Sequence, residues 1–279
     1  MSRTWLITGA SRGFGRRLAE AVLEGGEQVV ATARRPEQLA DLVGRFGALV
    51  RTAALDVTDA DAARAAVAAA VDAFGHLDVV VNNAGYANSG PIEEMAEADF
   101  RDQFEANFFG VVNVTRAALP VLRGQRSGVF VQFSSVGGRV GGTPGMGAYQ
   151  SAKFAVEGFS EVLASEVAPF GVKVIIVEPG AFRTDWQGSS MELHEVGPDY
   201  DETVGAMNRY RAENDGVQPG DPARAARVII DTVNHAAPPR RLLLGAQAVT
   251  SAVTAGEART EEARTWADVS AAADFPAGE

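Results

Sequence analysis

Short apolar runs alternate with longer helical patterns along most of this chain. The runs that we expect to form strands are residues 4–8, 28–33, 49–55, 77–85, 128–135, 172–180 and, at a sheet edge, 241–245. Strands that alternate with helices form parallel sheets through right-handed crossovers. Runs such as 28–33 are almost wholly apolar, as in strands buried on both faces. The pattern therefore predicts an α/β fold: one doubly wound domain with a mostly parallel seven-stranded sheet flanked by helices.

We expect a single domain over residues 1–279, with a core of about 3–245. Residues 181–220 interrupt the alternation, because they are polar and irregular apart from a short helical pattern near 201–213. Long loops of this kind are often substrate lids, and a surface excursion is the plainer alternative. Residues 222–236 form another helical pattern. The last segment, 246–279, is expected to form one helix and a partly ordered tail.

Composition excludes several classes of function. The formal net charge of −11 argues against nucleic acid or an anionic membrane as the main partner. The chain has no cysteine, which rules out disulfides and thiolate nucleophiles. His76, His194 and His235 are far apart and show no ligand spacing, so we predict no metal. The sequence shows neither a signal peptide nor a long apolar run, and we expect a soluble cytoplasmic protein with no membrane partner.

Three glycines follow the first expected strand in the sequence ITGASRGFG. Gly9 permits a tight turn, Gly13 leaves room for a pyrophosphate, and Gly15 lets the next helix pack closely. The helix N-terminus then presents unpaired N–H groups to an anion. This placement predicts a dinucleotide-binding turn, with a plain β–α turn as the alternative.

The second expected strand ends in ATARRP, without the acidic residue that NAD enzymes use for the ribose 2′-hydroxyl. Arg34 and Arg35 stand there instead, and Arg12 adds a cation inside the glycine loop. A guanidinium binds a phosphate through charge-assisted hydrogen bonds. The sequence therefore favours NADP(H), with Arg12 and Arg34 as clamps and Arg35 as a solvated neighbour.

Tyr149 and Lys153 are four residues apart in a helical pattern, and so share one helix face. A nearby ammonium favours the phenolate, which would lower the pKa of Tyr149 towards neutral pH and fit it for proton transfer. Lys153 is one of two lysines among 25 basic residues, which suggests that its chemistry is required. The alternative is a packing tyrosine beside a surface lysine.

Seven short motifs follow one another along the chain: TGASRGFG, LDVT, NNAG, NFFGVVNVT, FSS, YQSAK and VEPGAFRT. In these motifs the chain resembles the short-chain dehydrogenase/reductase family, in its short single-domain Rossmann branch, over roughly residues 3–245. Some details are similar to its retinol and 17β-hydroxysteroid dehydrogenase-like members. The resemblance implies an NADP(H)-dependent oxidoreductase that interconverts a ketone or aldehyde with an alcohol. It also implies a homodimer or homotetramer.

The resemblance assigns roles at matching positions. Ser135 would bind the carbonyl oxygen, Tyr149 would transfer the proton, Lys153 would hold the nicotinamide ribose, and Asn107 would hold a water linking Lys153 to solvent. The serine lies fourteen residues before the tyrosine instead of the usual thirteen, which leaves Ser134 as the alternative to Ser135. The implied cofactor contacts are Gly9, Ser11, Arg12, Gly13, Phe14, Gly15, Arg34, Asp56, Val57, Asn83, Ala84, Gly85, Tyr149, Lys153, Pro179, Gly180 and Thr184.

The substrate is not readable from the sequence beyond its class. Apolar side chains in the irregular segment, among them Phe182, Trp186 and Met191, suggest an apolar or aromatic small molecule. Trp186 and His194 are not assigned to the site, since lone residues of these types more often pack or face solvent. The alternative function is a catalytically silent NADP-binding regulator or scaffold of the same fold. An epimerase that retains its NADP is a third hypothesis.

Overall fold

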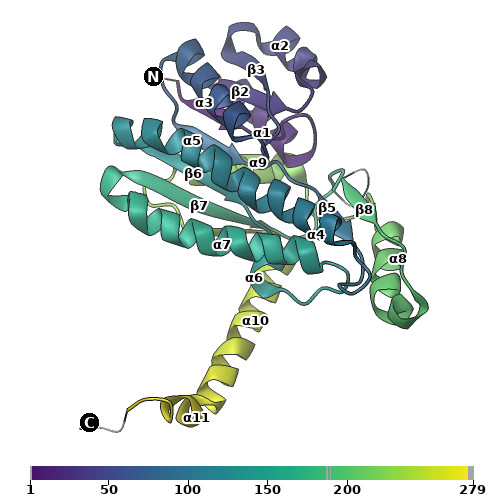
Figure 1. Cartoon of the computed structure of the whole chain (residues 1–279). Helices are drawn as coiled ribbons and strands as arrows, with labels where there is room; N and C mark the ends of the chain where they lie inside the picture. Colours follow the sequence, from purple (N-terminus) through teal and green to yellow (C-terminus); the bar gives the residue numbers. More distant parts are fainter. Residues whose placement is uncertain (1, 187, 189, 276–279) are drawn as a thin grey trace.

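A computed structural model describes residues 2–186, 188 and 190–275. It contains a seven-stranded sheet in the order β3-β2-β1-β4-β6-β7-β9, in which every neighbouring pair is parallel (Figure 1). The strands are β1 (Thr4–Ile7), β2 (Gln28–Ala33), β3 (Val50–Ala54), β4 (Val79–Asn82), β6 (Gly128–Phe133), β7 (Val172–Pro179) and β9 (Arg241–Leu244). The predicted α/β fold is confirmed, and the predicted last strand lies at an edge of the sheet.

Helices cover both faces of this sheet. One face packs against α1 (Gly13–Glu24), α2 (Ala40–Phe46) and α9 (Pro222–Asn234). The other packs against α3 (Ala60–Phe74), α5 (Gly110–Gln125) and α7 (Gly147–Val167). Side chains alternate along each strand, so Trp5 and Ile7 enter the first core while Leu6 enters the second. Burial on both faces explains why the strands are apolar almost without interruption.

The helix boundaries follow local signals in the sequence. Asp59 caps α3 by accepting hydrogen bonds from the N–H groups of Asp61 and Ala62. Asp221 caps α9 in the same way, with Pro222 in the first turn. Short 3₁₀ segments adjoin these elements at η1 (Pro36–Leu39), η2 (Gly47–Leu49), η4 (Ala168–Phe170) and η5 (Pro198–Tyr200).

Residues 99–122 have the sequence pattern of one long helix, and in the structure this helix is interrupted. It consists of α4 (Glu97–Phe104), a π-helical turn η3 (Glu105–Phe109) and α5. A π turn inserts one residue into a helix, which shifts the faces of the two flanking pieces and often marks a functional site. The glycine-rich stretch after β6 also contains a short helix, α6 (Val136–Val140), where the sequence indicated only a turn.

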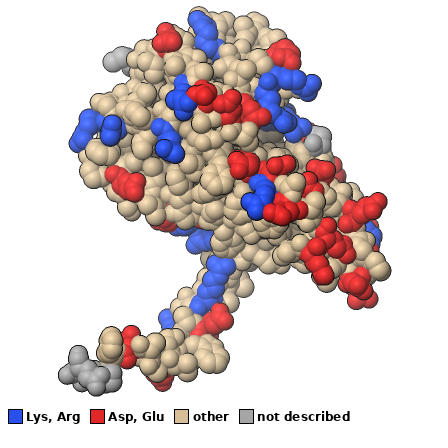
Figure 2. Space-filling view, in the orientation of Figure 1, with Lys and Arg blue, Asp and Glu red and all other residues tan. Residues whose placement is uncertain are grey.

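The irregular segment 181–220 carries more structure than its composition indicated. It holds a strand, β8 (Met191–Leu193), that pairs in parallel with β5 (Ala87–Ser89). It also holds a π turn, η6 (Asp201–Gly205), and α8 (Ala206–Glu213), where a short helix was predicted. Figure 1 shows this segment as a lobe beside α4, and Figure 2 shows acidic side chains gathered over it. Such an acidic surface is unsuited to binding a nucleic acid backbone.

The C-terminal segment forms two helices, α10 (Ala246–Thr265) and α11 (Ala267–Ala271), where one was expected. The first part of α10 packs near α6, and the rest stands away from the sheet as an arm (Figure 1). Of the described helices, none contains a stretch apolar and long enough to cross a lipid bilayer.

Candidate active site

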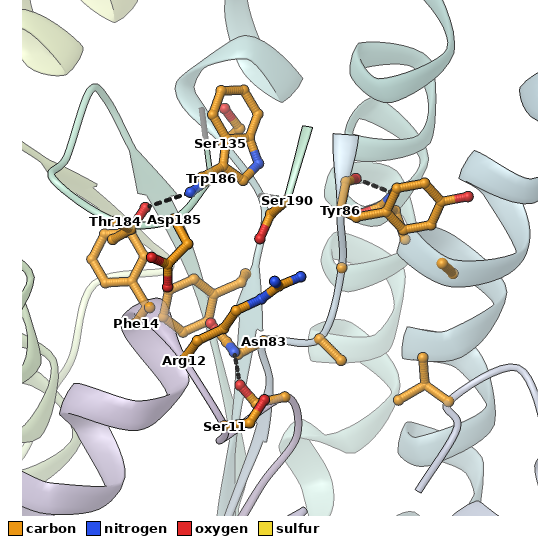
Figure 3. Close-up of a pocket in the computed structure, with 18 of the residues that line it drawn as sticks. Ser11, Arg12, Phe14, Asn83, Tyr86, Ser135, Thr184, Asp185, Trp186 and Ser190 are labelled. Carbon is orange, nitrogen blue, oxygen red and sulfur yellow. Dashed lines mark hydrogen bonds between the residues drawn. The ribbon is translucent and has the colours of Figure 1, made fainter. Parts of the chain in front are cut away.

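A cavity of about 840 Å³ opens at the carboxyl ends of the strands. In open α/β sheets this edge is where ligands bind. The predicted site residues that line it are Gly9, Ser11, Arg12, Gly13, Phe14, Arg34, Asp56, Val57, Asn83, Ala84, Gly85, Asn107, Ser135, Tyr149, Lys153, Pro179, Gly180 and Thr184. Gly15 alone of the predicted set does not line it. Figure 3 shows Ser11 and Arg12 of the β1–α1 loop together with Thr184, Asp185, Trp186 and Ser190.

The β1–α1 loop needs its glycines for two different reasons. Gly9 and Gly13 have φ of +65° and +57°, a region that other residues rarely adopt. A Cβ on Gly15 would lie 2.4 Å from the Gly9 carbonyl oxygen and 2.5 Å from Asn83 Nδ2. Gly15 therefore lets α1 pack against the loop and against Asn83, which is a closer neighbour than the strand named in the prediction.

The end of β4 braces this loop. Asn83 Nδ2 donates to the carbonyl oxygens of Thr8 at 3.0 Å and Gly9 at 3.2 Å. The backbone N–H groups of Asn83 and Ala84 both donate to Thr8 Oγ1, at 2.9 and 3.0 Å. These bonds hold the carbonyls of the turn in place, so that the first N–H groups of α1 face the cavity.

Basic and acidic side chains occupy the end of the cavity beside β2 and β3. Arg34 and Arg35 follow β2, and both line the cavity with exposed side chains. Arg35 was not assigned to the site from the sequence. Asp56 follows β3, and its Oδ1 accepts hydrogen bonds from Thr58 N at 3.0 Å and Thr58 Oγ1 at 2.8 Å. Asp56 is thus held in one rotamer at the cavity wall.

Tyr149 lies buried on the first turn of α7, with Ser135 as its hydrogen-bonding neighbour. Ser135 Oγ also accepts from Gly137 N at 3.0 Å and caps α6. Ser134 is buried, and its Oγ is 3.5 Å from the Lys153 carbonyl oxygen. The geometry therefore associates Ser135 with the Tyr149 hydroxyl and Ser134 with the backbone of α7.

Burial changes the charges expected for the pair of Tyr149 and Lys153. It raises the pKa of Tyr149 to about 12, with a smaller lowering by the hydrogen bond to Ser135. It also lowers the pKa of Lys153 to about 8, opposed by the charge of Glu157. Lys153 Nζ donates to the Phe133 carbonyl oxygen at 2.9 Å and is 5.7 Å from the centre of the Tyr149 ring. The expected lowering of the Tyr149 pKa is therefore wrong for the protein's own groups, because desolvation outweighs the hydrogen bond with Ser135, which is the only lowering cause among the described residues.

Asn107 lies in the π turn η3 and is fully buried. Its Nδ2 donates to the carbonyl oxygens of Tyr86 at 2.9 Å and Gln103 at 3.1 Å. Its Oδ1 has no hydrogen-bond partner among the described residues. A Cβ on Gly85 would lie 2.4 Å from this oxygen and 3.8 Å from Lys153 Nζ. Asn107, Gly85 and Lys153 thus lie close together, and the buried Oδ1 of Asn107 is an acceptor to which a donor, such as a water, would bind.

The segment after β7 closes another side of the cavity. The Trp186 ring is tilted against the Tyr149 ring, with centres 5.3 Å apart, and packs with Met191 and Met146. Sequence reasoning had left Trp186 out of the site, and its one signal was an aromatic residue in a polar stretch. His194 and Leu193 do not line the cavity. Other lining residues not assigned from the sequence include Tyr86, Asp102, Glu105, Asp185 and Ser190.

Within residues 2–186, 188 and 190–275, no group of three or more His, Asp or Glu side chains is arranged to hold a metal. The cavity instead combines a glycine turn, an arginine pair and a buried tyrosine with a lysine. These residues can hold a dinucleotide along the carboxyl ends of the strands, and the tyrosine can donate a proton next to one end of that dinucleotide.

Comparison with known proteins agrees with this geometry. The family profile described as short chain dehydrogenase matches residues 3–194. The chain is 48% identical over 273 residues to oxidoreductase BOA17 of Botryotinia fuckeliana, covering 98% of this chain and 99% of that protein. A short-chain dehydrogenase of Streptomyces avermitilis has a solved structure with a TM-score of 0.92 and 42% identity, covering 99% of this chain and all of that one.

Two further solved structures contain a bound cofactor. A short chain dehydrogenase/reductase of Burkholderia phymatum in complex with NAD has a TM-score of 0.79 and 25% identity, covering 90% of this chain and 92% of its own. A short chain dehydrogenase of Burkholderia cenocepacia in complex with NADP has a TM-score of 0.74 and 26% identity, covering 95% and 97%. Both nicotinamide dinucleotides thus occur among the structural neighbours.

Proposed function

Because this chain belongs to the short chain dehydrogenase family of oxidoreductases, we propose that it reduces a ketone or aldehyde to an alcohol, and the reverse, with NADP(H). The observation that supports this most is the meeting of Tyr149, Ser135 and Lys153 in the cavity that the glycine loop also lines. A nicotinamide dinucleotide as cofactor agrees with the neighbours that bind NAD or NADP.

The residues present fit such a cofactor. Gly9 and Gly13 adopt left-handed backbone at the start of α1, where N–H groups can bind a pyrophosphate. Asp56 and Val57 line the cavity after β3 and would contact the adenine, while Pro179, Gly180 and Thr184 line it at the end of β7, towards the other edge of the sheet, and would contact the nicotinamide. When bound, the nicotinamide supplies or accepts the hydride.

The protein's own residues would handle the oxygen and the proton. In reduction, Ser135 and Tyr149 donate hydrogen bonds to the carbonyl oxygen, and stabilise negative charge as it develops there. Tyr149 then releases its proton to that oxygen. Lys153 and Asn107 meet beside Gly85. Asn107 Oδ1, which has no partner among the described residues, would accept a hydrogen bond from a water, and that water would pass a proton from solvent to Lys153.

Replacement of Tyr149 by phenylalanine tests this mechanism. The ring and its contact with Trp186 remain, while the hydroxyl is lost. Turnover of a ketone panel should fall at least about a thousandfold, within the range seen for general acids, with NADPH affinity retained. Near-normal kcat in this variant would refute the assignment. Cofactor binding without turnover by the unmodified chain would instead favour the silent regulator.

The preference for NADP(H) is part of the proposal, and Arg34 and Arg12 support it because both line the cavity while no acid follows β2. Calorimetric titration should give NADPH binding at least about tenfold tighter than NADH, or 1.4 kcal/mol. Arg34→Ala should remove most of that difference, since charge-assisted hydrogen bonds contribute about 1.5–3 kcal/mol. Arg123→Ala, an exposed arginine outside the cavity, is the matched control. Tighter NADH binding by the unmodified chain would overturn the preference.

Trp186 lines the cavity and packs on Tyr149, with Met146 and Met191 packed beside them, and this apolar cluster supports an apolar or aromatic substrate. The segment 181–220 would act as the lid over it. A homodimer or homotetramer in the cytoplasm completes the proposal, and its mass in solution is measured by light scattering.

A further inference from the structure

Four charged side chains from four elements meet one helical turn beyond Lys153 along α7. They are Glu157 on α7, Glu178 on β7, Arg241 on β9 and Arg139 on α6. Glu157 is almost completely buried and the side chain of Glu178 is fully buried. Carboxylates are seldom buried in this way unless cations compensate them. The proposed reaction does not use this cluster, so its presence requires another explanation.

One guanidinium nitrogen serves both buried carboxylates. Arg241 Nε is 3.1 Å from Glu157 Oε2 and 3.1 Å from Glu178 Oε1. Arg139 Nη1 adds a longer contact of 3.4 Å to Glu178. Glu157 Oε1 has no hydrogen-bond partner among the described residues. Burial raises the pKa of Glu157, while the hydrogen bonds with Ser134 and Arg241 and the charge of Arg241 oppose that rise and favour the ionised form.

The carboxylate of Glu157 acts electrostatically on Lys153. The two residues are one helical turn apart on the buried face of α7. Lys153 Nζ has one hydrogen-bond acceptor in the described part of the chain, the carbonyl oxygen of Phe133. Among the charged groups of the protein, Glu157 is the one that raises the pKa of Lys153 against the effect of burial. Removal of this carboxylate would leave a buried ammonium without an anion nearby.

Resting on the proposed role of Lys153, we propose that Glu157 is a positioning residue that keeps Lys153 charged at neutral pH. Glu178 and Arg241 set the strength of this effect, because Glu178 competes with Glu157 for the same Arg241 N–H. The charged groups that face Glu157 are Lys153 and Glu161 of α7, Arg241 of β9, Glu178 of β7 and Arg139 of α6.

Nuclear magnetic resonance can measure the charge of Lys153 directly. The chain has two lysines, so protein labelled with ¹³C at lysine Cε gives two signals. Lys173 is exposed and donates to the Ala236 carbonyl oxygen, which makes it an internal reference. A Lys173→Arg variant assigns the two signals. The titration midpoint of Lys153 is then followed in the full chain without any need for turnover.

Glu157→Gln should lower the Lys153 midpoint by about 0.5–2 pH units, the effect of one charge at roughly 6 Å. Glu161→Gln is the matched control, because Glu161 is on the same helix and contacts the same Arg241 but is more exposed. It should move the midpoint by less than a third as much. Glu157→Asp, which retains the charge, should restore most of the shift and serves in place of Glu157→Gln if that variant does not fold.

In Glu157→Gln, the fall of kcat for reduction at high pH should begin at a lower pH, by the same shift as the titration midpoint of Lys153. An unmoved Lys153 midpoint, or an equal shift in Glu161→Gln, would overturn the inference. A shifted midpoint with an unmoved fall of kcat at high pH would also overturn it, because the charge would then have no role in turnover. An unmodified chain that reduces no carbonyl compound would overturn the proposed function while leaving the midpoints to be judged separately.

Discussion

Substitution of Gly15 by alanine separates local helix propensity from the packing of the cofactor loop. Gly15 lies in the first turn of α1, where alanine is favoured over glycine by about 1 kcal/mol on propensity alone. The structure predicts the opposite sign. An added Cβ would be 2.4 Å from the Gly9 carbonyl oxygen and 2.5 Å from Asn83 Nδ2, so both must move by roughly 1 Å to reach ordinary contact.

The size of the effect follows from what fixes that carbonyl. Asn83 Nδ2 would lose its hydrogen bonds to the Thr8 and Gly9 carbonyl oxygens, at about 1 kcal/mol each. The displaced loop adds about 1–3 kcal/mol of overpacking. After the gain of about 1 kcal/mol in propensity, Gly15→Ala should destabilise the protein by about 2–4 kcal/mol. That corresponds to a fall in Tm of roughly 4–16 °C.

Calorimetric melting of Gly15→Ala beside Gly158→Ala provides the assay. Gly158 is also a helical glycine, on α7, and a Cβ there meets nothing within 4 Å. Gly158→Ala should therefore be neutral or more stable by up to about 1 kcal/mol. NADPH affinity should fall in Gly15→Ala and stay unchanged in Gly158→Ala. A Gly15→Ala protein that melts at or above the unmodified Tm would refute the reasoning about the loop.

Two further predictions concern the buried pair at the site. The folded-state pKa of Lys153 is lowered to about 8, so the unfolded chain binds more protons between about pH 8 and 10.5, and stability should rise with pH across that window. Lys153→Met should abolish the rise, as measured by urea unfolding at pH 7.5, 9 and 10.5, and an unchanged slope would contradict the pKa. Trp186 lines the cavity beside Tyr149, so Trp186→Ala should raise KM for a bulky aromatic ketone by roughly 2- to 13-fold, from the loss of a ring contact of about 0.5–1.5 kcal/mol between the indole and the substrate. Acetone, which is too small to reach the indole, is the control substrate, and an equal rise in its KM would argue against a direct contact.

The sheet was predictable because its central strands are buried on both faces and form near-continuous apolar runs in the sequence. The small parallel pair of β5 and β8 was not, since each is three residues long and the two are a hundred positions apart. The π turn at 105–109 was missed for a different reason. Its one-residue insertion shifts a helical pattern without breaking it, so a single sequence reads as one helix.

The sequence placed the site residues through their position after strands, because the carboxyl ends of parallel strands share one edge. It could not give the burial of Tyr149 and Lys153, which depends on the ring of Trp186 and on elements distant in sequence. The four-residue spacing predicted that Lys153 lies near Tyr149. The direction in which the Tyr149 pKa changes depends on desolvation, which spacing does not give. Trp186 does pack, as its residue type suggested, but the sequence could not show that it packs on the proposed proton donor and lines the cavity.

The electrostatics of the site favour one direction of the proposed reaction. With a pKa of about 12, Tyr149 carries its proton throughout the neutral range, ready to donate to a developing alkoxide. Oxidation has to begin from the phenolate, which costs about 7 kcal/mol at pH 7 for a pKa near 12. Lys153 lowers this cost only while it is charged, and its own pKa of about 8 makes that charge depend on Glu157. Under these proposals, burial keeps Tyr149 protonated and the buried carboxylate of Glu157 keeps Lys153 protonated. Both effects prepare the site to donate a proton, which is the requirement of the reduction step.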